Sequence, residues 1–168
     1  MEIDVPAVSH RARIDVRASA DAAFAVVAAD LLATDDDRDA MVGHRPLQDG
    51  PLREGFRWQQ TIVHDRKVCR TDWVVTQLRP PWLLEQTMEH LCAVSRRELL
   101  GGERWELEVA GDGSTLVTLC AWRLCPGLEG WLQKIRGAGL RREASLSLSK
   151  RLAHVQFAAE RRPAGTVG

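Results

Sequence analysis

The chain has 168 residues, with 23 Lys or Arg against 23 Asp or Glu and therefore a formal net charge of zero. This length suits one domain with a core of its own, which we place at residues 1–162 ahead of a disordered tail at 163–168, and zero net charge argues against nucleic-acid binding. The four cysteines form no Cys-x-x-Cys pair and no stretch approaches 18 apolar residues, so we expect a cytoplasmic protein with no stable membrane insertion.

The N-terminal part predicts a strand followed by a capped helix. From Ser9 to Arg17 apolar and polar side chains alternate, which is the period of a strand with one wet face. Ser19 then stands at an N-cap position, ahead of apolar residues at helical spacing as far as Leu31. The acidic, Gly- and Pro-containing segment that follows predicts a further turn of helix, a loop and a short edge strand at 44–48.

The middle of the chain predicts a run of antiparallel strands. Alternation covers residues 55–63, 67–78 and 82–91, and two prolines separate the last two because proline cannot donate ladder hydrogen bonds. The turn sequence Gly-Asp-Gly-Ser at 111–114 lies between two further alternating stretches. Its glycines tolerate a positive φ, so we expect a β-hairpin there.

Glycines divide the C-terminal helical region. One helix over residues 128–160 would be about 50 Å long, whereas strands of about ten residues span only about 33 Å. A break at Gly137 to Gly139 leaves a short helix at 128–136. The remaining helix, from about Leu140, is about 31 Å long and matches the sheet.

Four stretches carry a resemblance to a known superfamily. They are VRASADAAFAVVAAD (16–30), WVVTQLRPPWLLEQT (73–87), GERWELEVAGDGSTLVTLCAWRL (102–124) and LSLSKRLAHVQFAAE (146–160). In this order the chain resembles the START-like or SRPBCC superfamily, in particular its polyketide cyclase/dehydratase and lipid-transport branch. The resemblance implies an α+β helix-grip fold, in which a curved antiparallel β-sheet wraps around a long C-terminal α-helix, with two short helices near the N-terminus and a ligand cavity between sheet and helix.

Small residues on the terminal helix are the first candidates for that cavity. We expect Gly139, Ala144, Ser145 and Ser149 to line it, because side chains of this size cannot fill the space across to the sheet. The alternative is that they only allow the helix to approach the sheet closely. Arg142 is placed at the cavity mouth, where it pairs with a ligand carboxylate or phenolate, or else faces solvent.

Strand alternation supplies the remaining candidates. Gln60 and Gln86 fall among apolar residues of the inward parity, which is costly unless each finds a partner or a ligand. The parity of strand 67–78 is ambiguous, and we place Trp73 inward. Trp82, Leu84 and Cys120 are also expected to face in. The strand residues predicted to bind the ligand are Phe56, Trp58, Gln60, Ile62, Trp73, Gln86, Met88, Trp105 and Trp122.

These observations predict a protein that binds or carries a small hydrophobic molecule, such as a polyketide, a quinone or a lipid-like compound. We expect no cofactor and no metal, because the acidic residues at 35–39 lack EF-hand spacing and the His and Cys residues lack zinc spacing. The alternative is an enzyme of the polyketide aromatase/cyclase type with unassigned catalytic residues, and the absence of Tyr counts against it. A third reading, a protein-interaction module, requires an exposed apolar patch. The chain is expected to be a monomer or a homodimer.

Overall fold

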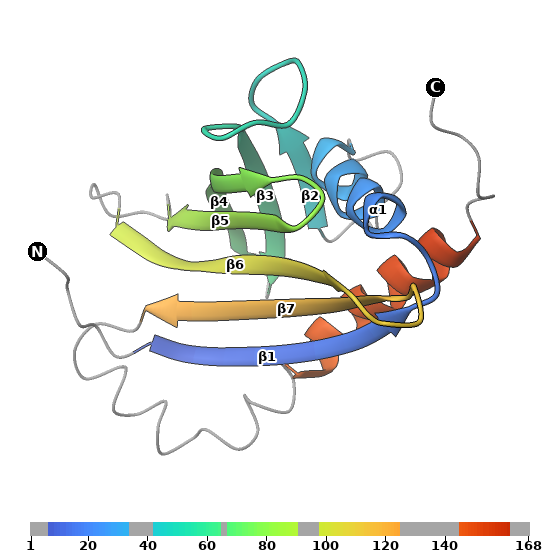
Figure 1. Ribbon diagram of the computed structural model, residues 1–168. Helices are drawn as coiled ribbons and strands as arrows, with labels where there is room; N and C mark the ends of the chain where they lie inside the picture. Colours follow the sequence, from blue (N-terminus) through green and yellow to red (C-terminus); the bar gives the residue numbers. More distant parts are fainter. Residues whose placement is uncertain (1–6, 34–41, 65–66, 91–97, 125–144, 162–168) are drawn as a thin grey trace, which may run out of the picture.

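The computed structural model describes residues 7–33, 42–64, 67–90, 98–124 and 145–161. Seven strands form one curved antiparallel sheet in the order β1-β7-β6-β5-β4-β3-β2 (Figure 1). The helices are α1 (Ala20–Leu32) and the C-terminal helix, described over residues 145–160. The strands are β1 (Ala7–Val16), β2 (Val42–Pro46), β3 (Arg57–His64), β4 (Lys67–Arg79), β5 (Leu83–His90), β6 (Glu98–Val109) and β7 (Thr115–Leu124).

The predicted strands and the predicted hairpin are confirmed. β6 and β7 pair from Gly101 with Arg123 to Val109 with Thr115, and Gly113 in the turn has a φ of 83°. That left-handed conformation favours glycine because it has no Cβ. The two prolines lie between β4 and β5, joined by a cis peptide bond, and β2 is an edge strand as expected.

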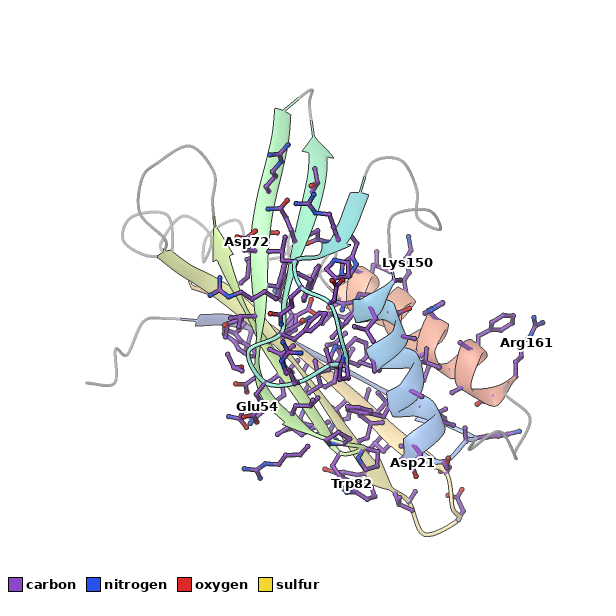
Figure 2. The ribbon with its side chains drawn as sticks, turned by 90° about the horizontal axis from the view of Figure 1, so that it is seen from above. Asp21, Glu54, Asp72, Trp82, Lys150 and Arg161 are labelled. Carbon is purple, nitrogen blue, oxygen red and sulfur yellow. The ribbon has the colours of Figure 1, made fainter. Side chains whose placement is uncertain are left out.

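The N-terminal helix begins where the sequence predicts. The hydroxyl oxygen of Ser19 accepts a hydrogen bond from the backbone N–H of Ala22 at 3.2 Å, which satisfies one of the free donors of the first turn. Both helices lie on the same side of the sheet (Figure 2). The second N-terminal helix turn, the helix expected at 128–136 and the tail fall outside the described residues.

The core lies between the sheet and the two helices. The C-terminal helix contributes Leu148, Leu152, Val155 and Ala159, whose spacing forms one stripe along the helix. These residues pack in one cluster with Phe24 of α1 and with buried residues of the strands. We call the helix-covered side of the sheet the inner face; its members include Trp58, Val75, Leu84, Trp105 and Leu119.

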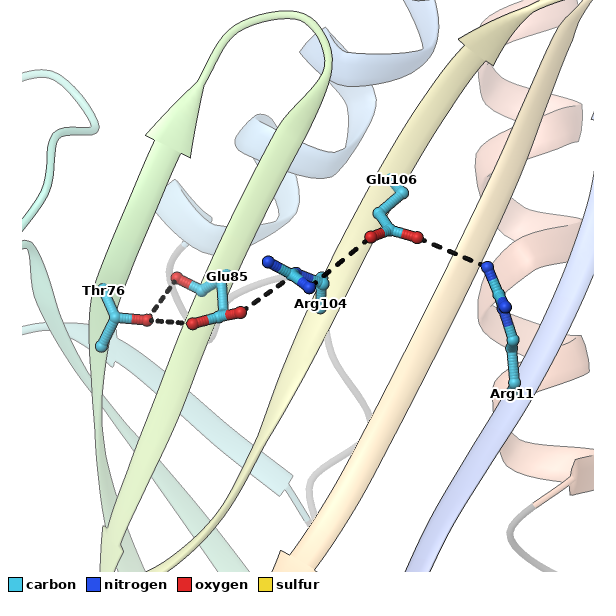
Figure 3. A network of polar contacts seen from close by, with 5 residues as sticks. All are labelled: Arg11, Thr76, Glu85, Arg104 and Glu106. Carbon is cyan, nitrogen blue, oxygen red and sulfur yellow. Dashed lines mark hydrogen bonds and ion pairs between the residues drawn. The ribbon is translucent and has the colours of Figure 1, made fainter. Parts of the chain in front are cut away.

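The opposite side of the sheet, the outer face, carries a row of charged side chains (Figure 3). Thr76 donates to Glu85 at 3.2 Å, and Arg104 bridges Glu85 at 3.0 Å and Glu106 at 3.7 Å. Glu106 in turn pairs with Arg11 at 3.5 Å. Partly exposed pairs of this kind contribute at most about 1 kcal/mol each. The row shows that residues of this parity face water, which fixes the other parity as the inner face. In the part of the chain that is described, no helix is long and apolar enough to cross a membrane.

Candidate functional site

Two stacked tryptophans form the centre of the inner face. Trp58 of β3 pairs across strands with Trp73 of β4, which pairs with Met88 of β5. The two indoles are nearly parallel, with ring centroids 5.2 Å apart and an interplanar angle of 7°. Phe56 is fully buried two residues before Trp58. These four predicted site residues therefore share one apolar surface.

A chain of hydrogen bonds starts from this surface. The indole Nε1–H of Trp58 donates to Oε1 of Gln86 at 2.9 Å, and the amide Nε2–H of Gln86 donates to Oε2 of Glu103 at 3.1 Å. Gln86 and Glu103 are paired neighbours on β5 and β6. Gln86 is buried, and buried polar groups need hydrogen-bond partners. Both the oxygen and the nitrogen of its amide have one.

An ion pair links this chain to the C-terminal helix. Arg151 donates from Nη1 to Oε1 of Glu103 and from Nη2 to Oε2 at 2.8 Å, which is a two-pronged contact. The guanidinium also lies 5.2 Å from the ring centroid of Trp105, within the range of a cation–π contact. The side chain of Glu103 is 13% exposed and that of Arg151 is 40% exposed. The helix is thus fixed to β6 by a polar contact beside the core.

Both members of the pair are charged at neutral pH. Burial alone raises the pKa of Glu103, but the charge of Arg151 and the hydrogen bonds from Arg151 and Gln86 outweigh burial, so this pKa lies below its usual value. Burial lowers the pKa of Arg151, and the charges of Glu103 and Asp30 more than compensate, so that pKa is raised. The contact therefore joins a carboxylate and a guanidinium rather than two neutral groups.

A second polar group lies beside the tryptophans. His44 of β2 pairs across strands with Gln60 of β3, which pairs with Thr71 of β4. The buried His44 ring lies 4.2 Å from the Trp58 ring, and its Nδ1 is 2.7 Å from the carbonyl oxygen of Ala33, so Nδ1–H is the donor there. The hydroxyl oxygen of Thr71 accepts from Nε1 of Trp73 at 3.3 Å.

The placement of Trp105 is confirmed and that of Trp122 is corrected. Trp105 pairs with the buried Leu119 on the inner face, whereas Trp122 pairs with Gly102 and lies on the outer face. Its indole covers Gly102 so closely that a Cβ there would be 2.4 Å from Trp122 Cζ2. Cys120 shares the parity of Trp122, so the prediction that it faces inward is also wrong. The physical reason is that β7 carries apolar side chains on both parities, so alternation alone does not select its buried side.

Other predicted residues are not brought to the site. Trp82 precedes β5 and is exposed instead of facing inward. Ser145 and Ser149 are exposed on the C-terminal helix, because the stripe through Leu148 takes the side toward the sheet. Gly139 and Arg142, and the side chain of Ile62, lie outside what the structure describes.

Glu103, Arg151, His44 and Thr71 were not among the predicted site residues. Glu103 had a usable signal, because it shares the parity of Trp105 and Leu107 and is therefore a charged residue on an apolar side. No sequence pattern indicates Arg151, since its partner Glu103 is 48 residues away in the chain.

No protein-family model matches the chain, and no curated protein matches its sequence. Solved structures do match it. The Zhui aromatase/cyclase from Streptomyces sp. R1128 superposes with a TM-score of 0.62 at 17% identity, covering 95% of this chain and 99% of that one. Protein CV1439 from Chromobacterium violaceum gives 0.61 at 10% identity, with 92% and 99% covered. Ara h 8.0201 gives 0.60 at 13% identity, with 92% and 96% covered.

The chain shares the START-like fold of these solved structures. A further match, the Polyketide_cyc-like protein Cgl2372 from Corynebacterium glutamicum, has a TM-score of 0.55 at 13% identity. The expected α+β class with a curved antiparallel sheet and a C-terminal helix is confirmed. At these identities the START-like fold is what the proteins share. The hydrogen-bond series from Trp58 to Arg151 is described for the residues of this protein alone.

Proposed function

We propose that this START-like chain binds or carries a small hydrophobic ligand, such as a polyketide, a quinone or a lipid-like molecule, between the inner face and the C-terminal helix in a helix-grip arrangement. The observation that carries the proposal is the series of hydrogen bonds from Trp58 through Gln86 and Glu103 to Arg151, set in a mainly apolar and Trp-rich surface. Sites for such ligands combine apolar walls with a few oriented polar groups.

A contribution to stability does not by itself explain why this series of hydrogen-bonded polar residues is present. Burying a charge is costly, and replacing a buried ion pair by apolar residues of similar volume is often neutral or stabilising. A core that had only to hold the helix could use more residues like Leu152 and Val155 in place of Glu103 and Arg151. Recognition of a ligand's polar group supplies the missing reason, while the surrounding apolar area provides affinity at about 25 cal/mol per Å².

Binding of the neutral dye Nile red tests the proposal with a matched pair of variants. Trp58→Phe changes the inner face and removes the donor to Gln86, whereas Trp122→Phe makes the same chemical change on the outer face. We expect saturable binding to the wild type, a several-fold weaker affinity for Trp58→Phe and an unchanged affinity for Trp122→Phe. Absence of saturable binding to the wild type, or an equal loss in both variants, would contradict a ligand site on the inner face.

Native mass spectrometry of the purified protein gives an independent test. A hydrophobic carrier is expected to retain molecules from its host, visible as a mass increment that disappears on denaturation. Wild type and Trp122→Phe are expected to show the same increment, and Trp58→Phe a reduced one.

A second candidate is an aromatase/cyclase-type enzyme. The observation in its favour is that two proton-transfer side-chain types, the His44 imidazole and the Glu103 carboxylate, lie on the same inner face, in a fold that also matches the Zhui aromatase/cyclase over 99% of its length. Such groups move protons next to a carbonyl when a substrate is held against them. A poly-β-ketone thioester should then cyclise faster with the wild type than with Glu103→Gln at equal Nile red affinity. A product profile identical to the protein-free reaction would exclude this candidate.

A further inference from the structure

The series of hydrogen bonds has a direction. Trp58 donates to Gln86, Gln86 donates to Glu103, and Arg151 donates to Glu103 from the other side. Every hydrogen bond therefore runs toward the Glu103 carboxylate, whose two oxygens accept three of them. The indole N–H of Trp58 is fully engaged, whereas Gln86 and Glu103 keep unused lone pairs. Both are little exposed, Gln86 at 1% and the Glu103 side chain at 13%.

Arg151 is the most accessible member of this series of hydrogen bonds, and it has hydrogen-bonding capacity left for a ligand. The guanidinium has five N–H donors and no acceptor, and two of its nitrogens serve Glu103. With 40% of its side chain accessible, Arg151 has donors left for another molecule. A ligand that meets the series here must therefore bring a hydrogen-bond acceptor.

The charges around Arg151 determine whether this acceptor is neutral or anionic. Glu103 already neutralises the guanidinium, and Asp30 of α1 lies near enough to stabilise its charged form. Asp30 also lies 3.4 Å from Nε2 of His154 on the C-terminal helix. The guanidinium paired with the Glu103 carboxylate has no net charge. An incoming anion would meet no net attraction and would still lose its hydration.

We infer that the ligand presents a neutral acceptor, such as a ketone, ester or amide carbonyl, to Arg151, and that the site discriminates against carboxylates. The inference rests on the proposed function and narrows its ligand class. Glu103 then acts as a specificity-determining residue, because its negative charge balances that of Arg151 and leaves N–H donors on an ion pair with no net charge.

Displacement of Nile red by methyl 2-naphthoate and by 2-naphthoate tests the inference, since the two probes share one ring system and differ in charge. We expect the ester to displace the dye from the wild type at about tenfold lower concentration than the acid, because the acid loses hydration beside an ion pair that has no net charge. Glu103→Gln removes the neutralising charge, so the preference should move toward the acid by about tenfold, and less so in high salt. The double variant Glu103→Gln/Arg151→Gln should lose affinity for the ester without gaining affinity for the acid.

The outcomes separate the inference from the proposed function. Nile red binding with the acid equal to or better than the ester on the wild type would overturn the inference and leave the proposed function standing, as would binding that neither probe displaces. Absence of Nile red binding would remove both. The comparison of ester and acid on the wild type tests the inference even if Glu103→Gln fails to fold. The circular dichroism spectrum of the variant would reveal such a failure.

Discussion

Replacing Arg151 by methionine leaves the Glu103 carboxylate in the interior without its charged partner. Breaking one side of a buried pair costs about 3–5 kcal/mol. Because 40% of the Arg151 side chain is accessible, water replaces part of the lost interaction, and we reduce the expected loss in the free energy of unfolding to about 2 kcal/mol. Methionine retains most of the side chain's apolar stem, so the change reports mainly on the charge.

Urea unfolding followed by tryptophan fluorescence measures this loss. Arg11→Met is the matched control, because Arg11 is 51% exposed and makes a single 3.5 Å contact with Glu106 on the outer face; we expect a change below about 0.5 kcal/mol. The double variant Glu103→Gln/Arg151→Met should recover most of the lost stability, since no unpaired charge remains. The reasoning is refuted if Arg151→Met costs no more than Arg11→Met, or if the double variant is as unstable as the two single losses added together.

The same pair predicts a pH dependence with a definite sign. The pKa of Glu103 is below its ordinary value of 4.5 in the folded protein, so the pair's contribution to stability is present above that value and is lost as the pH falls through the folded pKa. In Arg151→Met the residue that lowers the pKa of Glu103 is gone, so burial favours the protonated form of Glu103. The stability difference between wild type and Arg151→Met should therefore be full near neutral pH, begin to shrink at the raised pKa of Glu103 in the variant, and go on shrinking below 4.5. A difference that stays constant from neutral pH into that acid range would contradict the assignment.

Two further predictions use matched positions. Leu148→Ala should destabilise the fold by about 2–4 kcal/mol, whereas Leu146→Ala should change it by less than about 0.5 kcal/mol, because the two side chains are 4% and 55% exposed; equal losses in urea unfolding would show that another helix face meets the sheet. Gly102→Ala should cost about 1–3 kcal/mol, since its Cβ would lie 2.4 Å from Trp122. Gly111→Ala, with no atom within 4 Å of the added Cβ, is the control, and equal thermal unfolding midpoints for both variants would contradict the close packing.

The fold was predictable because its signals are local. Alternation marks a strand wherever one face is wet, and the charged residues of the outer face made β5 and β6 recognisable in the sequence. A cap residue such as Ser19 and a turn glycine such as Gly113 set the element ends for reasons confined to a few residues. β7 shows the limit: Leu119 and Trp122 belong to opposite parities of an apolar strand, and only the register with β6 assigns them to faces.

The candidate site was predictable only in its apolar part. Trp58 and Gln86 come from strands whose inward parity the sequence indicates, whereas the parity of the strand that carries Trp73 was ambiguous. The structure brings the three residues together. Glu103 and Arg151 meet because the C-terminal helix crosses the sheet at one particular place, and no local pattern encodes that placement. The expected small-residue lining at Ser149 gave way to the Leu148 stripe for a simpler reason, because helices turn their apolar side to the core.

The direction of the hydrogen bonds constrains each residue of the series by its neighbours. Leucine at position 86 would leave the buried Trp58 N–H without its acceptor, and glutamate there would face Glu103 with a second carboxylate in place of an N–H donor. Lysine in place of Arg151 could not reproduce the two-pronged contact while keeping donors to spare. These constraints extend over three strands and one helix. They leave the accessible side of Arg151 as the place where an outside molecule reaches the network most easily without displacing one of its members.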